Sequence, residues 1–157
     1  MGKKLSDRFH RPSGKTLIVL GAAVAILAAA AIWLFLLKGE EEIEFTVLEE
    51  SQIPQEITAQ VIPEYRTLER ALACKVGETI YVLATRGEKT SSGYDINISK
   101  MVMVEEDGKT SLVVYAEFTD PESGASLTQT LTYPLQVAAT ELTELPDSIE
   151  LKVRYAD

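Results

Sequence analysis

A run of 21 residues without a charged side chain, from Leu17 to Leu37, constrains this chain more than any other stretch. The run also lacks proline, and it has no polar face of the kind that a helix on the surface of a soluble protein shows. A helix of this length extends roughly 31 Å, close to the thickness of about 30 Å of the hydrocarbon core of a bilayer. Because backbone groups in lipid must bond within the segment, the run predicts a single transmembrane helix.

The apolar run divides the chain into a basic tail (1–16), the predicted span (17–37), an acidic spacer (38–42) and a domain (43–157). Five Lys and Arg and one Asp precede the run, whereas four Glu follow it within seven residues. Since positive charge is retained in the cytoplasm, we expect a single-pass protein of the cell membrane with its N-terminus in the cytoplasm and its C-terminal domain outside. A cleaved signal peptide is the alternative, which the bulky residues at the end of the run disfavour.

The part of the chain after the run is acidic. Residues 39–157 contain nine Lys and Arg against 23 Asp and Glu, a net charge of about −14. Such a surface repels phosphate backbones, so nucleic acid is not an expected partner. Cys74 is the only cysteine, which excludes a disulfide within the chain, and we expect its thiol to be buried or half-buried.

Apolar and polar residues alternate through most of the domain, as in strands with one buried face. A change of phase near Lys100 predicts a β-bulge, and Asp107 followed by Gly108 predicts a tight hairpin turn. The predicted strands are 43–48, 79–85, 94–104, 111–118, 127–131, 135–139 and 149–155.

A different pattern lies between Ser51 and Cys74, where apolar residues recur every three or four positions, as on an amphipathic helix. Pro54 suits a first helical turn, and Pro63 predicts a kink or a break. The predicted fold class is therefore α+β, mainly β: a single N-terminal transmembrane helix followed by a small antiparallel β domain with a helical segment packed on it.

The residues expected outside the cytoplasm offer little catalytic chemistry. The only histidine, His10, lies in the tail, so a histidine-based nucleophile or metal site is not expected in the domain. No calcium-binding or phosphate-binding loop motif is present either. We predict that the protein is not an enzyme and uses no metal or cofactor; a catalytic pair of Asp and Glu is the alternative.

One polar loop, GEKTSSGY at residues 87–94, stands out between two predicted strands. Gly93 permits a backbone conformation that is closed to other residues, and Tyr94 then restarts the sheet. Loops of this kind on rigid scaffolds commonly carry recognition. An ordinary hairpin loop is the simpler interpretation of the local pattern.

Two motifs resemble a known family. The run GEKTSSGYDINI at 87–98 resembles the G-x-K-P-T-G-G-Y-x-V-x-I signature of the C-terminal domain of the bacterial protease-complex subunit PrcB. The run TQTLTYPLQVAAT at 128–140 is similar to the T/V-x-Q-x-x-T-Y-P segment of that domain. The approach to the domain, FTVLEESQIP at 45–54, also fits, so the likeness covers roughly residues 43–140.

This chain departs from the family signature in the middle of the loop. Thr90, Ser91 and Ser92 stand where the family has proline, threonine and glycine, whereas Gly93 and Tyr94 are kept. The resemblance implies a non-catalytic, extracytoplasmic protein-interaction module that assists or stabilises an exported protease complex.

The predicted partner is an exported protease or another envelope protein. An inhibitor of exported peptidases is one alternative, because the loop is also similar to the T-T-G-Y loop of chagasin-like inhibitors, and a structural envelope module is another. The predicted partner-binding residues are Lys89, Thr90, Ser91, Ser92, Gly93, Tyr94, Thr132, Tyr133 and Pro134.

Overall fold

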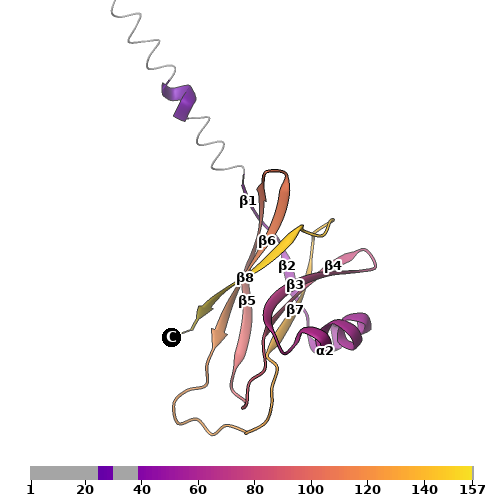
Figure 1. Ribbon diagram of the computed structural model, residues 1–157, viewed down its shortest axis with the longest axis vertical. Coiled ribbons are helices and arrows are strands. Elements are labelled where there is room, and N and C mark those ends of the chain that lie inside the picture. The colour runs from indigo at the N-terminus through magenta and orange to yellow at the C-terminus, as the bar shows by residue number, and fades with distance from the viewer. Residues whose placement is uncertain (1–24, 30–38, 157) are drawn as a thin grey trace, which may run out of the picture. The chain divides into compact units, whose positions relative to one another are not determined.

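Two four-stranded β-sheets pack against each other in the computed structural model, which describes residues 25–29 and 39–156 (Figure 1). The strands are β1 (Glu40–Glu42), β2 (Phe45–Val47), β3 (Glu69–Val76), β4 (Thr79–Arg86), β5 (Asp95–Glu106), β6 (Lys109–Thr119), β7 (Leu135–Thr140) and β8 (Ser148–Tyr155). The first sheet has the order β1-β5-β6-β8, and the second has the order β2-β7-β4-β3.

The main core lies between the two sheets. Alternate residues point into it from strands of both sheets, such as Val82 and Ala84 of β4 and Leu112 and Val114 of β6. Phe118, near the end of β6, is fully buried and is the largest side chain of this core. Burial of one such side chain contributes about 1.5–3 kcal/mol, so this alternation fixes which face of each strand turns inward.

A short helical segment covers the outer face of the second sheet. It consists of a 3₁₀ turn (Glu50–Gln52), a π-helical turn (Ile57–Val61) and the α-helix α2 (Ile62–Tyr65). The fully buried Ile57 packs with Leu83 and Val137 in a second apolar cluster. The middle strands of this sheet are therefore buried on both faces, which explains why β4 is almost continuously apolar.

The predicted helical segment is too long at its C-terminal end. Helical structure ends at Tyr65, and Glu69–Val76 forms β3, which pairs with β4 along its whole length. Ala71 and Ala73 face the main core while Leu72 and Cys74 face the helical segment. When both faces of a strand carry apolar residues, the alternation of apolar and polar residues disappears from the sequence. The spacing of Leu68 and Leu72 therefore resembles that of an amphipathic helix.

The predicted fold class is wrong in several respects. The described residues form a mainly β structure of two sheets with a short helix, rather than an α+β domain. The first sheet is not antiparallel throughout, because β8 pairs with β6 in parallel after the chain returns from β7 in the second sheet. Alternation predicts a strand but carries no information on its direction.

The predicted transmembrane helix is not supported. Across residues 25–29 and 39–156, no helix is long and apolar enough to cross a membrane. Of the predicted span, 17–37, only residues 25–29 are described. These five residues are helical and account for about 7.5 Å of the roughly 30 Å required. The rest of the span lies outside the described residues, as does the basic tail.

Two further segments differ from expectation. Residues 40–42 of the predicted spacer form β1, which pairs with Val102–Val104 of β5. Residues 127–131, predicted as a strand, have no regular structure, because Thr128 bonds to Ser92 of a neighbouring loop instead of joining a sheet. Both are short polar stretches, for which local pattern is a weak guide to pairing.

Several turn predictions are confirmed. The pairing of β5 with β6 shifts between Ile98 and Lys100, where the bulge was expected. Asp107 and Gly108 both have positive φ, 52° and 74°, in the tight turn between these strands.

The prediction for the only cysteine is also confirmed, because Cys74 is half-buried and forms no disulfide.

Ile57 tests the role of the helical segment. We expect Ile57→Ala to lower the free energy of unfolding by about 2–5 kcal/mol, since it leaves a cavity in the second cluster. Leu68→Ala, at a side chain that is 48% exposed, should change it by about 0.5 kcal/mol or less. Urea unfolding of both variants measures the difference. Equal losses of unfolding free energy in the two variants would show that packing of Ile57 against the second sheet does not stabilise the fold.

Candidate functional site

The two parts of the predicted site meet although they lie about 40 residues apart in the sequence. Lys89 and Thr132 exchange two backbone hydrogen bonds, each with an N to O distance of 2.9 Å. Ser92 and Thr128 are joined similarly: the Ser92 N–H donates to the Thr128 carbonyl, and the Thr128 N–H donates to the Ser92 hydroxyl. We call residues 87–94 and 128–134 the paired loops.

Side-chain bonds reinforce the paired loops. The Thr132 hydroxyl donates to the Ser91 carbonyl over 2.8 Å, and the Tyr133 hydroxyl donates to the Glu88 carboxylate over 2.9 Å. This bond to Glu88, together with burial, raises the pKa of Tyr133 above its ordinary value, although nearby Arg66 opposes the shift. Tyr133 therefore stays protonated at neutral pH and acts as a hydrogen-bond donor rather than a base.

Gly93 cannot carry a side chain in this structure. Its φ is +92°, and a Cβ would lie 2.8 Å from Cβ of Pro121 and 2.9 Å from Cδ2 of Leu127. Both neighbours belong to the long segment between β6 and β7, which lies at the end of the sandwich opposite the β5–β6 hairpin (Figure 1). Glycine thus lets this segment close over the loop.

The predicted residues differ in accessibility. Thr90 and Gly93 are exposed, and Lys89, Ser92, Tyr94, Thr132, Tyr133 and Pro134 are half-buried. Ser91 is only 6% exposed, so its contribution is to hold Thr132 rather than to offer its own side chain. The paired loops therefore present a small polar surface with two tyrosine rings.

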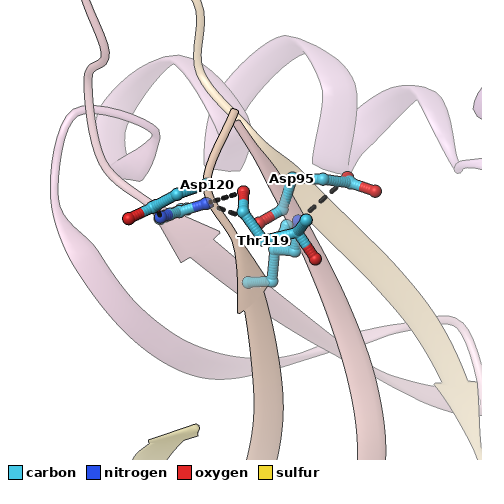
Figure 2. A network of polar contacts seen from close by, with 5 residues as sticks. Asp95, Thr119 and Asp120 are labelled. Atoms are coloured by element: carbon cyan, nitrogen blue, oxygen red, sulfur yellow. Dashed lines mark hydrogen bonds and ion pairs between the residues drawn. The ribbon is translucent and has the colours of Figure 1, made fainter. Parts of the chain in front are cut away.

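Arg86, which is not among the predicted site residues, lies beneath this surface and stabilises it. Its side chain is 2% exposed and donates to the carbonyls of Asp95, over 2.9 Å, and Thr119, over 2.5 Å. It also forms an ion pair with Asp120. Figure 2 shows Asp95, Thr119 and Asp120 gathered in this network. Arginine at the end of an apolar strand reads as a surface residue, so only the fold reveals its role.

The guanidinium of Arg86 is also surrounded by aromatic rings. Its central carbon lies 5.0 Å from the ring centre of Tyr94 and 4.7 Å from that of Phe118. Its Nε has no hydrogen-bond partner among the described residues. Favourable contact between the cation and the ring faces compensates part of this loss, and it fixes Tyr94 of the paired loops over the core.

A groove of about 630 Å³ adjoins the paired loops. It runs between the helical segment and the N-terminal end of β7, and Tyr94, Thr132, Tyr133 and Pro134 of the predicted site belong to its lining. Arg66 connects the two sides, since its guanidinium carbon lies 4.3 Å from the centre of the Tyr133 ring. The predicted residues thus form one wall of a surface depression.

The polar groups of the paired loops include no metal-binding cluster among the described residues. Among the described residues, no cluster of three or more His, Cys, Asp or Glu side chains is placed to hold a metal ion. Burial raises the pKa of the Cys74 thiol, which disfavours the reactive thiolate. The paired loops contribute hydroxyls, tyrosine rings and backbone groups instead.

Gly93 provides a test of the loop conformation. We expect Gly93→Ala to lower the free energy of unfolding by about 2–5 kcal/mol, from backbone strain and overlap with Pro121 and Leu127. The matched control is Gly77→Ala, where φ is also positive, +62°, but nothing lies within 4 Å of the added Cβ. It should cost about 1–2 kcal/mol. Similar losses in urea unfolding would contradict the close packing at Gly93.

Arg86 provides a second test. We expect Arg86→Met to lower the free energy of unfolding by roughly 3 kcal/mol, because two carbonyls lose a charged donor. Trypsin should also cleave after Lys89 sooner in this variant, as the loop opens. Arg70→Met, on exposed residue Arg70 of β3, is the control. If the rate of cleavage after Lys89 does not change, Arg86 does not stabilise the paired loops.

Comparison with known proteins agrees with the resemblance over part of the chain. Residues 80–141 match the family model described as PrcB C-terminal. No curated protein and no solved structure matches the chain. The matched residues extend from β4 to the residue after β7 and include both paired loops. The expected likeness to the PrcB C-terminal domain is therefore confirmed for residues 80–141, and that part of the chain is similar to this family.

Proposed function

We propose that residues 39–156 are a non-catalytic protein-interaction module that recognises its partner through the paired loops. The partner is an exported protease or another envelope protein. The observation that carries the proposal is the pairing of Lys89 with Thr132, which joins two separate sequence motifs into one surface.

Preorganisation supports a role in binding. A loop that is ordered before it meets its partner avoids the entropy cost of ordering on association. Here the Lys89–Thr132 and Ser92–Thr128 bonds fix the loop from one side, and Arg86 fixes Tyr94 from below.

The residues on the surface suit a protein partner. Tyr, Trp and Arg contribute most of the binding energy in many protein interfaces. Tyr94 and Tyr133 are half-buried, which leaves part of each ring accessible, and Lys89 Nζ lies 5.6 Å from the centre of the Tyr94 ring. A partner that covers these rings would bury apolar area and still find polar groups at the edge.

The departures from the family signature are compatible with this proposal. Ser92 replaces a glycine of the signature, and its hydroxyl accepts the Thr128 N–H over 2.9 Å. Ser91, in place of threonine, is buried and its carbonyl accepts from Thr132. The Ser92 hydroxyl thus supplies a bond to Thr128 that a glycine at this position would lack.

The proposal concerns residues 39–156 alone. Location of this module outside the cytoplasm remains a prediction from the charges near the chain's N-terminus, and digestion of whole cells with an added protease would test it.

Site-specific photo-crosslinking in cells of the producing organism tests the proposed function. A crosslinking residue at Thr90 should yield an adduct with an exported protease or another envelope protein. The same residue at Lys109, in the hairpin at the opposite end of β5, should not. Replacing Tyr94 and Tyr133 by alanine should reduce the yield at Thr90 roughly tenfold.

Identical adducts from both positions, or a yield unaffected by the tyrosine variants, would refute recognition by the paired loops. If the full chain also inhibits a captured peptidase at equal molar ratio, the chagasin-like alternative replaces the stabilising role.

A further inference from the structure

The groove beside the paired loops is bordered by an incompletely covered strand. On one side, β4 pairs with all of β7, from Leu135 to Thr140. On the other side, β2 pairs only with Ala138–Thr140, and the last bond is from the Leu48 N–H to the Val137 carbonyl, 2.8 Å. The chain then turns into the helical segment, so the start of β7 is a free sheet edge.

Alternation of the backbone shows which groups face the groove. Pro134 accepts a hydrogen bond from the Arg86 N–H, and Thr132 pairs with Lys89, so the backbone groups of even-numbered residues point toward β4 and the loop that follows it. Those of Tyr133 and Leu135 therefore point the opposite way. No hydrogen bond joins their N–H or C=O groups to another described residue. The backbone N–H and C=O groups of these two residues can therefore pair with a further strand.

The groove follows this edge along its length. Five consecutive residues, Tyr133 to Val137, line one wall. Apolar side chains from the opposite wall include Leu48, Ile53 and Ile62. A depression with a free strand edge on one wall and apolar side chains on the other has the features that strand addition uses: backbone bonds for affinity and pockets for alternate side chains.

The charge of the groove indicates which charge a bound segment should carry. Three acidic residues, Glu49, Glu50 and Asp95, belong to its lining, which contains no Lys or Arg. The guanidinium of Arg66 lies beside the groove, against the ring of Tyr133, so the acidic residues outnumber this cation. Opposite charge favours encounter and orients the bound chain, whereas like charge is disfavoured. An acidic strand would therefore be repelled, and a basic one attracted.

We propose that this groove binds an extended basic segment of the partner protein, which adds to the open edge of β7 as a further strand. Alternate apolar side chains of the segment enter the groove, and its Lys or Arg side chains lie over the three carboxylates. This inference rests on the proposed function, because it assigns the partner a second contact next to the paired loops.

Binding of synthetic peptides to the full chain in a nonionic detergent tests the proposal by fluorescence anisotropy. The probe is a labelled hexapeptide of alternating lysine and valine, and its counterpart has glutamate in place of lysine. We expect the basic peptide to bind at least tenfold more tightly. N-methylation of one alternate set of amides should weaken binding at least tenfold, and methylation of the other set should have little effect, since only one set faces β7.

Variants of the protein provide the matched control. Glu49→Lys with Glu50→Lys should weaken binding of the basic peptide roughly tenfold. Glu105→Lys with Glu106→Lys, on two exposed residues at the opposite end of β5, makes the same change in net charge and should have less than a twofold effect. Equal loss in both double variants, equal effects of the two methylation patterns, or no binding of either peptide would overturn the proposal.

The two proposals fail separately. If the peptides do not bind but crosslinking at Thr90 still depends on Tyr94 and Tyr133, recognition by the paired loops stands without strand addition. If the basic peptide binds as expected but Thr90 yields no specific adduct, the groove is a peptide site and the function assigned to the paired loops is wrong.

Discussion

The buried guanidinium of Arg86 is the interaction on which the candidate site depends. Arg86 ends β4 in the second sheet, yet its side chain bonds to the ends of two strands of the first, at the Asp95 and Thr119 carbonyls, and to the carboxylate of Asp120, the residue after β6. The ring of Tyr155, in the last strand, lies within 5.9 Å of it. A buried charge is costly unless it is paired, so these partners must all be in place when the two sheets close.

This constraint links the folding of the core to the order of the surface. The strand β4 continues into the first of the paired loops immediately after Arg86, and β5 begins at Asp95 immediately after that loop. Because Arg86 binds the Asp95 carbonyl, both ends of the loop are held next to each other. A loop with fixed ends loses less entropy when it forms its bonds to Thr128 and Thr132, which favours order in a loop rich in serine and threonine.

Much of the β structure was predictable because its residues alternate clearly, as in β5, β6 and β8. The bulge at Ile98 and the turn at Asp107 were predictable because each has a local cause. Prediction failed where tertiary contacts decide: Leu72 and Cys74 are apolar on the outer face because the helical segment covers them, which hides the strand period. The same holds for the candidate site. Gly93 and Tyr94 could be predicted from the local sequence, whereas Arg86 gains its role only from contacts with residues up to 34 positions away.

The helical segment also explains why a groove exists at this sheet edge. Ile57 must lie against Leu83 and Val137 to cover the second sheet, and this holds the segment away from the start of β7. The short β2 ends where the chain departs toward that position, so the edge at Leu135 is left open as a consequence of covering the sheet elsewhere. An open edge invites pairing with other chains unless it is protected. In the strand addition that we propose, the acidic residues beside this edge favour strands of opposite charge, so that a general liability of β-sheets becomes a source of selectivity.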